Sequence, residues 1–403
     1  MDRNIQLRVL IVGLGTSEVT FLNRLVDGLA REGVHITISS SKRRVIDRFP
    51  KGKVEWLWAP SWHGFGLVRI LRILLIFFKG LLGKRLKWLR EIINSRETFR
   101  DKLAALHRYL PFLRGEWDVI YFPWNSTAVD YIDLFDLGIP VMISCRGSQI
   151  NIRPHRQGQE RYSSLLKQTL KKAAAVHCVS ANILANALGL GLDSEKAVVI
   201  RPAVDPAVFS LTTEQYQNGP IRLITIGSLV WNKGYEYLLM AVKLWKDRGA
   251  ITELHIIGEG AERNRILFTA QDLDIASQVL LHGKLPPAEV IQQLQQSDIF
   301  VLSSLSEGIS NAVLEAMSCS LPIVTTECGG MREAVQDGVQ GFVVPVRDPE
   351  SMAEAVQKLA LDPDLRKSMG RAGRERVLAE FNSQTQIEAF VNLFESVRVN
   401  ETN

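Results

Sequence analysis

The chain has 403 residues, more than one hydrophobic core of about 250–300 residues accommodates, so two domains are expected. Hydrophobic residues make up 46% and charged residues 23%, which is typical of a globular protein and excludes a disordered or membrane-spanning chain. The net charge of +5 is unevenly spread, because residues 1–210 hold 31 basic and 18 acidic residues.

The first half alternates short apolar runs with amphipathic stretches. An apolar run at 8–12 ends in Gly13-Leu14-Gly15, and residues 21–29 have the spacing of a helix. Strands are predicted at 8–12, 34–38, 119–122, 141–144 and 176–179. This alternation is typical of a doubly wound α/β domain around a parallel sheet.

A basic and apolar segment interrupts this pattern. Residues 62–115 hold 12 basic and 3 acidic residues, and the apolar ones recur at helical spacing. The run 67–78 is shorter than the roughly 20 residues that span a bilayer. The pattern fits docking on an anionic membrane surface and fits equally well a core helix with a solvated basic face.

The strand and helix pattern restarts after Pro202. Strands are predicted at 221–226, 253–257, 279–282, 299–302 and 322–325. Ser383 and Gln386 form a predicted capping box ahead of a final amphipathic helix. We therefore expect an N-terminal acceptor-binding domain at 1–202, a C-terminal nucleotide-sugar-binding domain at 203–382, and a last helix at 383–403 that returns to the first domain.

Several other site types are excluded by spacing. The four cysteines form no CxxC pair and have no His partner at metal-ligand spacing, which predicts reduced thiols and no metal site. Glu18 stands where a dinucleotide-binding loop has its third glycine, which argues against NAD. No aromatic stacking platform for nucleic acid is apparent. The N-terminus has no signal-peptide layout, so we expect a cytoplasmic protein, peripheral on the inner face of the membrane if residues 62–115 dock there.

The stretch from Ser306 to Glu315 carries the strongest chemical signal. It follows the apolar run 299–302 and leads into a helix, and ligands of open α/β sheets bind at the carboxyl ends of strands. A helix start offers free amide groups to a diphosphate. Glu307 is placed to bind sugar hydroxyls, and Glu315, about two turns along, to bind a ribose. The loop between them supplies the candidate donor-binding residues Gly308, Ile309, Ser310 and Asn311.

A second strand, loop and helix unit strengthens this interpretation. Gly227 to Gly234 follows the strand at 221–226, and Lys233 supplies a cation for the negative charge that develops on a departing diphosphate. Taken alone, Glu307 would be interpreted as stabilising the helix dipole, Glu315 as a surface residue of the helix, and Lys233 as a solvated loop residue. Two such units in one domain favour a nucleotide-sugar site.

These motifs together resemble glycosyltransferase family 4. Glu307 and Glu315 resemble its Glu, seven residues, Glu signature, and Lys233-Gly234 resembles its phosphate-binding Lys-Gly. Gly329-Gly330 resembles the Gly-Gly turn that follows. The resemblance covers nearly the whole chain and is strongest from 221 to 344. It implies the GT-B fold, with two facing Rossmann-like domains, a central cleft and a C-terminal crossover helix.

The resemblance also implies residue roles. Glu307 would contact the donor sugar, Glu315 the ribose, and Lys233 the diphosphate, with retention of anomeric configuration and without a metal. Gly15 would belong to the glycine loop that approaches the donor phosphates. Ser228 stands where the family usually has Arg, Arg146 where it often has His, and Thr16 where a second glycine is common. Arg146 is a candidate for the displaced cation, and we count it with Glu307 and Lys233 as catalytic.

The expected function is therefore a retaining, metal-independent hexosyltransferase of polysaccharide or glycolipid biosynthesis. Its donor would be a nucleotide diphosphate sugar, a co-substrate rather than a cofactor, with UDP preferred to GDP, and its acceptor a saccharide or a lipid-linked saccharide. One alternative is a nucleotide-sugar 2-epimerase, which would form product without an acceptor. Another is an inactive nucleotide-sugar-binding protein that has lost catalysis through Ser228.

Overall fold

The protein was analysed as a computed structural model that describes residues 7–13, 20–41, 46–47, 49, 52–59, 85–113, 115–210 and 219–398. Gly15, Thr16, Glu18 and residues 62–84 and 114 of the basic segment lie outside the described residues. The chain divides into two compact units. The first comprises residues 1–178, 184–200 and 387–403, and the second comprises residues 179–183 and 201–386.

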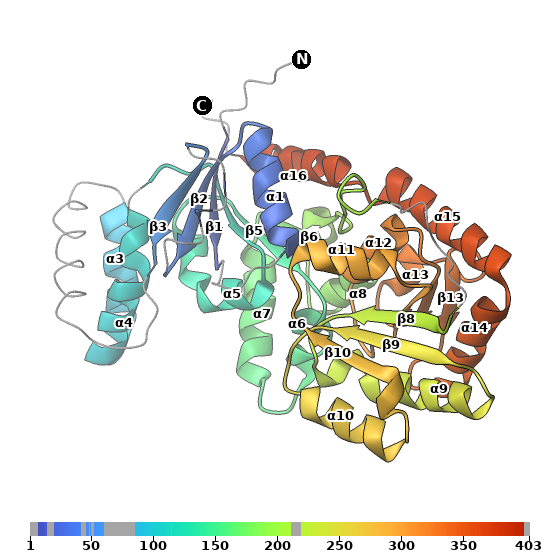
Figure 1. The fold of residues 1–403 in the computed structure, drawn as a ribbon. Coiled ribbons are helices and arrows are strands. Elements are labelled where there is room, and N and C mark those ends of the chain that lie inside the picture. Colours follow the sequence, from blue (N-terminus) through green and yellow to red (C-terminus); the bar gives the residue numbers. More distant parts are fainter. Residues whose placement is uncertain are drawn as a thin grey trace. The chain divides into compact units, whose positions relative to one another are not determined.

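The first unit is built on a seven-stranded parallel sheet of order β3-β2-β1-β4-β5-β6-β7 (Figure 1). Its strands are β1 (Arg8–Val12), β2 (His35–Ser40), β3 (Val54–Trp58), β4 (Val119–Phe122), β5 (Val141–Cys145), β6 (Ala175–Cys178) and β7 (Ala197–Val199). The five strands predicted in this half are confirmed. β3 and β7 are additional, and both lie at edges of the sheet.

The helices described between these strands are α1 (Thr20–Arg31), α3 (Arg85–Asn94), α4 (Phe99–Tyr109), α5 (Asn125–Asp130), α6 (Ser148–Asn151), α7 (Glu160–Lys172) and α8 (Ala181–Gly189). α16 (Ser383–Val397) joins this unit from the far end of the chain. Its buried Phe390 and Phe394 contact the ring of Tyr121 on β4, with ring centroids 5.9 and 5.5 Å apart. The same apolar cluster contains residues of α1, β1 and β2.

The predicted capping box of α16 is wrong. The amide of Gln384 donates to Oδ1 of Asn382 (2.8 Å), so Asn382 caps the helix. Gln386 instead donates from Nε2 to the carbonyl of Arg201 (2.7 Å). Asn382, one position before Ser383, is the N-cap because its short side chain reaches the amide of the second residue after it.

The second unit contains a six-stranded parallel sheet of order β10-β9-β8-β11-β12-β13 (Figure 1). The strands are β8 (Ile221–Ile226), β9 (Thr252–Ile257), β10 (Val279–Gly283), β11 (Ile299–Leu302), β12 (Ile323–Thr326) and β13 (Gly341–Val344). All five predicted strands are present, and β13 at the edge was not predicted.

Helices bury both faces of this sheet. They are α9 (Tyr235–Asp247), α10 (Arg263–Asp272), α11 (Pro287–Gln295), α12 (Asn311–Ser318), α13 (Met331–Ala334), α14 (Pro349–Leu361) and α15 (Pro363–Glu380). One apolar cluster joins α9, α10 and α14 to the sheet, and another joins α11, α12, α13 and α15 to it. Both units are thus doubly wound and Rossmann-like, which confirms the predicted fold class.

Each sheet reverses its strand order once. In the second unit the chain steps from β8 outward to β9 and β10, then returns to place β11 on the other side of β8. In the first unit the same reversal occurs between β1 and β4. Loops that leave two strands at such a point diverge and leave room for a ligand, which locates the candidate site of the second unit at the ends of β8 and β11.

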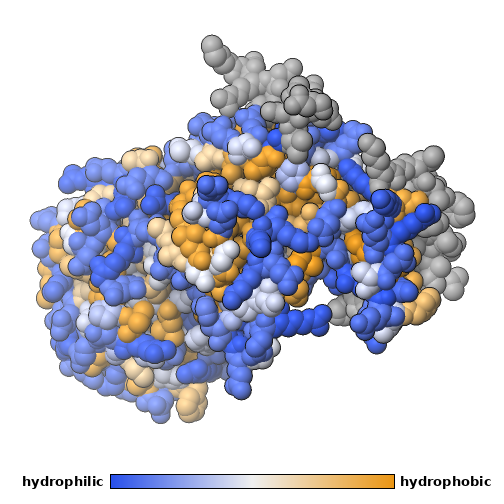
Figure 2. All heavy atoms as spheres, turned by 180° about the vertical axis from the view of Figure 1, so that it is seen from behind, coloured by the Kyte–Doolittle hydropathy of each residue, from blue (hydrophilic) through white to orange (hydrophobic). Residues whose placement is uncertain are grey.

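The surface of the described part is largely hydrophilic on the face in Figure 2, with hydrophobic side chains in patches between the polar ones. Of the helices that are described, none combines the length and the apolar character needed to cross a bilayer.

Candidate functional site

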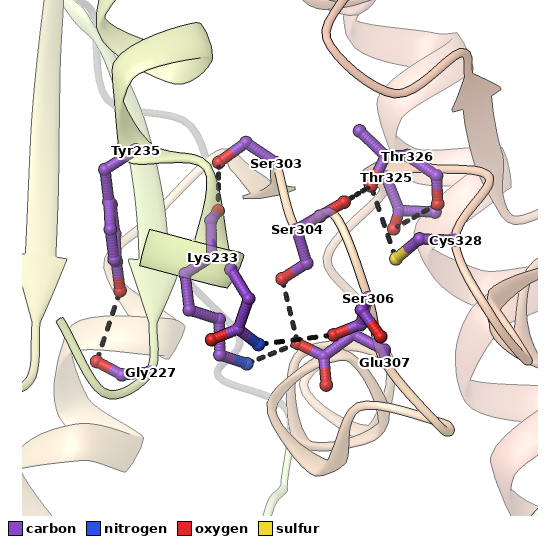
Figure 3. A network of polar contacts seen from close by, with 11 residues as sticks. Gly227, Lys233, Tyr235, Ser303, Ser304, Ser306, Glu307, Thr325, Thr326 and Cys328 are labelled. Carbon is purple, nitrogen blue, oxygen red and sulfur yellow. Dashed lines mark hydrogen bonds and ion pairs between the residues drawn. The ribbon is translucent and has the colours of Figure 1, made fainter. Parts of the chain in front are cut away.

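Two loops bring Lys233 and Glu307 together at the carboxyl end of the second sheet (Figure 3). Lys233 ends a short 3-10 helix after β8, and Gly234 follows it in the left-handed conformation (φ 62°). This conformation suits glycine, and it lets the chain turn directly into α9. Glu307 lies in the loop between β11 and α12. The two residues are 74 positions apart, and the sequence placed both at the site.

The Glu307 carboxylate is held on one oxygen by two side chains. Its Oε1 accepts a hydrogen bond from Nζ of Lys233, which also forms an ion pair with it, and another from Oγ of Ser304 (2.8 Å). The Lys233 side chain is 17% exposed and that of Glu307 is 15% exposed. Partial burial strengthens this pair relative to one in bulk water.

Backbone contacts fasten the two loops to one another. Ser303 donates from Oγ to the carbonyl of Lys233 (2.9 Å), and the amide of Leu305 donates to the carbonyl of Asn232 (2.8 Å). Asn232 in turn donates from Nδ2 to the carbonyl of Ser306 (3.5 Å). The positions of Lys233 and Glu307 are therefore coupled through the main chain as well as through their side chains.

The last residue of β12 and the loop after this strand support the Glu307 loop. Thr326 donates from Oγ1 to the carbonyl of Ser304 (2.5 Å), and the amide of Gly330 donates to the carbonyl of Gly308 (2.7 Å). Gly329 has a φ of 56°, and a Cβ atom there would lie 1.9 Å from the carbonyl oxygen of Glu307. The Gly-Gly turn is therefore required because the two backbones touch.

Helix α12 begins directly after this loop. Ser310 precedes its first residue, Asn311, and the side chain of Ser310 makes no capping hydrogen bond within the described structure. The first amides of α12 thus point toward the loop end, where an anion is stabilised by the helix dipole. Ile309 anchors the loop in the apolar core, and Glu315 lies in the second turn of α12, buried at 9% exposure.

Two neighbouring groups remain uncharged at neutral pH. The hydroxyl of Tyr235 donates to the carbonyl of Gly227 (3.2 Å), and burial together with the charge of Glu307 raises its pKa. Burial also raises the pKa of the Cys328 thiol to about 11. The charges in this cluster are therefore those of Lys233 and Glu307.

Of the other predicted site residues, Ser228 lies at the same strand end as Lys233, whereas Arg146 belongs to the first unit. Ser228 is exposed just beyond the end of β8. Arg146 follows β5 in the first unit, with its guanidinium carbon 4.2 Å from the ring centre of Phe21, and burial lowers its pKa. Gly13 has a φ of 92°, and a Cβ atom there would lie 2.5 Å from Cγ2 of Thr127, whereas Gly15 lies outside the described residues.

Some contributing residues were not predicted as such. Ser304 and Thr326 hold the Glu307 loop, but single hydroxyl residues at strand ends carry no spacing signal. The carboxylate of Glu333 accepts hydrogen bonds from the amides of Ala181 (3.1 Å) and Asn182 (3.2 Å), two residues of the segment 179–183 that belongs to the second unit.

Comparison with known proteins identifies two family models. Residues 18–203 match the glycosyl transferase 4-like domain, and residues 213–376 match the glycosyl transferases group 1. Together the two matches cover most of the chain. Lys233, Glu307 and Glu315 all fall within the second match.

Individual relatives are more distant. An amylovoran biosynthesis glycosyltransferase, AmsK of Erwinia amylovora, is 28% identical over 214 residues, which are 52% of this chain and 53% of that protein. The chain thus spans about half the length of this relative. A putative colanic acid biosynthesis glycosyltransferase, WcaL of Salmonella typhimurium, is 25% identical over 294 residues, 71% of this chain and 72% of that one.

A solved structure matches almost end to end. HepE of Anabaena, determined in complex with UDP, covers 97% of this chain and 100% of its own, with a TM-score of 0.71 and 15% identity. A likeness at this identity shows a shared fold.

Proposed function

The chain belongs to the glycosyltransferases that join a 4-like domain to a group 1 domain, and on this premise we propose that it transfers a hexose from a nucleotide diphosphate sugar to a saccharide or lipid-linked acceptor. The observation that carries the proposal is the convergence of Lys233 and Glu307 at the reversal of strand order, beside the start of α12. A cation, a carboxylate and free helix amides are the groups that a sugar diphosphate requires.

In the proposed reaction, the bond between the anomeric carbon and the diphosphate oxygen breaks, and a bond to an acceptor hydroxyl oxygen forms. The hydroxyl gives its proton to an oxygen of the departing diphosphate, which leaves with the bonding electron pair. Nζ of Lys233 and the first amides of α12 stabilise the negative charge that develops on the leaving group. We propose that the reaction retains the anomeric configuration and needs no metal.

Glu307 and Glu315 hold the two ends of the donor. Glu307 accepts hydrogen bonds from the hexose hydroxyls, and Glu315 accepts them from the ribose. The contact between Lys233 and Glu307 keeps both side chains at the site before the donor arrives, which lowers the entropic cost of binding. When the donor binds, Lys233 shares its three N–H groups between Glu307 and the diphosphate.

We further propose UDP as the donor nucleotide and polysaccharide biosynthesis as the setting. HepE, which shares the fold, binds UDP, and the two bacterial relatives are named for the biosynthesis of amylovoran and colanic acid. Arg146 is the candidate second cation in place of the missing Arg at 228. The proposed location is cytoplasmic, with attachment to the inner membrane face through residues 62–115.

The test measures transfer and hydrolysis of a radiolabelled UDP-hexose panel in EDTA, with and without a lipid extract of the source cells as acceptor. We expect Lys233→Ala to lower kcat by about 10²–10³-fold, as loss of one oxyanion-type donor does. Lys243→Ala is the matched control, because Lys243 on α9 pairs only with Asp247 among the described residues. Equal activity of Lys233→Ala and wild type would contradict the proposal, and product formed equally without acceptor would indicate an epimerase.

A further inference from the structure

Two consecutive serines after β11 contact the two charged residues of the candidate site in different ways (Figure 3). Ser303 donates from Oγ to the main-chain carbonyl of Lys233 (2.9 Å). Ser304 donates from Oγ to the side chain of Glu307 (2.8 Å). Both serines are buried, at 2% and 0% exposure. Of the two hydroxyls, it is therefore that of Ser304 that acts directly on a charged side chain.

The main chain of Ser304 is itself held in place. Thr326, the last residue of β12, donates from Oγ1 to the carbonyl of Ser304 (2.5 Å). β12 pairs with β11 in parallel, so this contact joins the ends of two neighbouring strands. A buried hydroxyl without an acceptor is costly, which favours the conformation in which the Ser304 hydroxyl bonds Glu307. Ser304 thus offers Glu307 a hydrogen-bond donor of fixed position.

Lys233 and Ser304 donate to the same oxygen of the carboxylate, Oε1 of Glu307. In the proposed reaction, Lys233 turns part of its N–H groups to the diphosphate, which its flexible stem and rotatable donors permit. Glu307 is only 15% exposed, so water replaces a lost donor poorly. A hydrogen bond from a hydroxyl to a carboxylate is charge-assisted and strong. Ser304 is the donor that remains on Oε1 when Lys233 is shared.

We propose that Ser304 is a positioning residue for the hexose of the donor. It keeps the Glu307 carboxylate oriented toward the hexose hydroxyls while Lys233 is shared with the diphosphate. The proposal rests on the glycosyltransferase function proposed above and adds to it a residue that acts through Glu307. A carboxylate that is oriented before the hexose arrives loses less entropy on binding. Loss of the Ser304 hydroxyl therefore weakens the hold on the hexose and spares the hold on the nucleotide.

The test compares two ligands by calorimetric titration of the full chain in EDTA: UDP-hexose, and UDP, which lacks the hexose. We expect Ser304→Ala to raise the Kd of UDP-hexose about tenfold and to change the Kd of UDP by less than about twofold. Thr326→Val removes the donor to the Ser304 carbonyl with little change of shape. It should raise the Kd of UDP-hexose about threefold, because Ser304 is then held less firmly.

A second pair of variants tests whether Ser304 acts through Glu307. The same two ligands are titrated into Glu307→Ala and into Ser304→Ala/Glu307→Ala. Once the carboxylate is removed, the Ser304 hydroxyl has nothing to position, so we expect these two variants to bind UDP-hexose equally. A serine that only stabilised the fold would weaken the binding of UDP and UDP-hexose alike, with or without Glu307.

Ser297→Ala is the matched control, because Ser297 is also buried, at 4% exposure, and its hydroxyl donates to the carbonyl of Gln293 (2.7 Å) ahead of β11. It should bind both ligands as wild type does. Equal weakening of UDP and UDP-hexose in Ser304→Ala would overturn the proposal, as would a further loss in the Glu307→Ala background. Unchanged affinity in both Ser304→Ala and Thr326→Val would also overturn it. If wild type binds neither ligand, the proposed function itself fails, and this proposal falls with it.

Discussion

Ser228 is the residue at which this chain departs most from the expected donor site. It is exposed beyond β8, in the loop that leads to Lys233. Under the proposed function, the diphosphate meets a hydroxyl there where the resembled family supplies a guanidinium. A charge-assisted contact is about twice as strong as a neutral one, so its absence weakens donor binding unless another cation replaces it.

We predict that Ser228→Arg increases donor affinity about tenfold, which corresponds to roughly 1.4 kcal/mol. Calorimetric titration with the UDP-hexose measures it. Ser228→Gln is the control, since its side chain extends into the same loop without a charge. An equal gain in both variants, or a gain in neither, would argue against a phosphate at this position.

At the residue scale, the sequence predicted that Lys233 and Glu307 follow strand ends of one sheet, but it did not predict their direct contact. Lys233, Glu307 and Glu315 were identifiable because each follows an apolar strand at a characteristic spacing. Ser304 and Thr326 were not, since their importance comes from neighbours that only the folded sheet brings together. The direct contact between Lys233 and Glu307 likewise depends on β8 and β11 being adjacent.

The prediction of strands from the sequence was also limited, because some of the edge strands were not identified. The apolar strands β1, β4, β8 and β11 lie inside the sheets and were predicted within a residue, because buried parallel strands are continuous apolar runs. The missed strands lie at sheet edges. β7 has only 3 residues, all partly exposed, β13 begins with a glycine, and β3 mixes Glu55 with aromatic residues, so their sequences contain a weaker signal.

The loop after β12 supports the Glu307 loop, and this can be tested with two glycines. Gly329 and Gly338 both have positive φ, but only at Gly329 would a Cβ atom meet another backbone. We predict that Gly338→Ala costs about 1 kcal/mol of stability and leaves kcat unchanged. Gly329→Ala should cost more and lower kcat by at least tenfold, because it displaces Glu307. Thermal unfolding measures the stability of both variants, and transfer assays measure their kcat. Equal kcat values in the two variants would contradict the claim that the loop after β12 holds the Glu307 loop in place.

α16 is the element that ties the end of the chain to the first unit. Phe390 is fully buried against Tyr121 and His177, whereas Phe99 on α4 is 81% exposed. We predict that Phe390→Ala lowers the free energy of unfolding by about 3–5 kcal/mol and that Phe99→Ala changes it by less than about 0.5 kcal/mol. Denaturant unfolding distinguishes them. Similar changes in unfolding free energy for the two variants would show that the packing of α16 contributes little to the stability of the first unit.

At the scale of the whole molecule, a buried polar chain makes the first unit sensitive to acid. Tyr121 contacts Ser144 (2.7 Å), Ser144 contacts Nδ1 of His177 (2.6 Å), and Nε2 of His177 contacts the carbonyl of Ile200 (2.8 Å). That carbonyl can only accept, so Nε2 carries the proton and Nδ1 accepts from Ser144. Burial, and after it the charge of Arg146, lowers the pKa of His177 to about 3.

The sign of the pH effect follows from this shift. Below the ordinary pKa of about 6.5, His177 is protonated in the unfolded chain but stays neutral in the folded chain. The free energy of unfolding therefore falls as the pH drops from 6.5 toward 3. At pH 5 the loss is about 2 kcal/mol relative to pH 7. Urea unfolding followed by tryptophan fluorescence suits the test, since six of the eight tryptophans belong to the first unit. In His177→Asn, this loss of unfolding free energy between pH 7 and pH 5 should disappear. If the stability of the variant depends on pH as that of wild type does, the lowered pKa of His177 is contradicted.

The central claim is that the second unit binds a nucleotide diphosphate sugar through Glu315 and the loops that carry Lys233 and Glu307. The most direct measurement is thermal stabilisation of wild type, Glu315→Ala and the exposed control Glu354→Ala by UDP, GDP, ADP and their hexose conjugates, all in EDTA. Ligand at 100 times its Kd stabilises by about 2.7 kcal/mol, which raises the Tm of a unit of this size by roughly 5–10 °C. The account predicts such a rise for uridine nucleotides with wild type and Glu354→Ala, and none with Glu315→Ala. No rise with any nucleotide for wild type would contradict it.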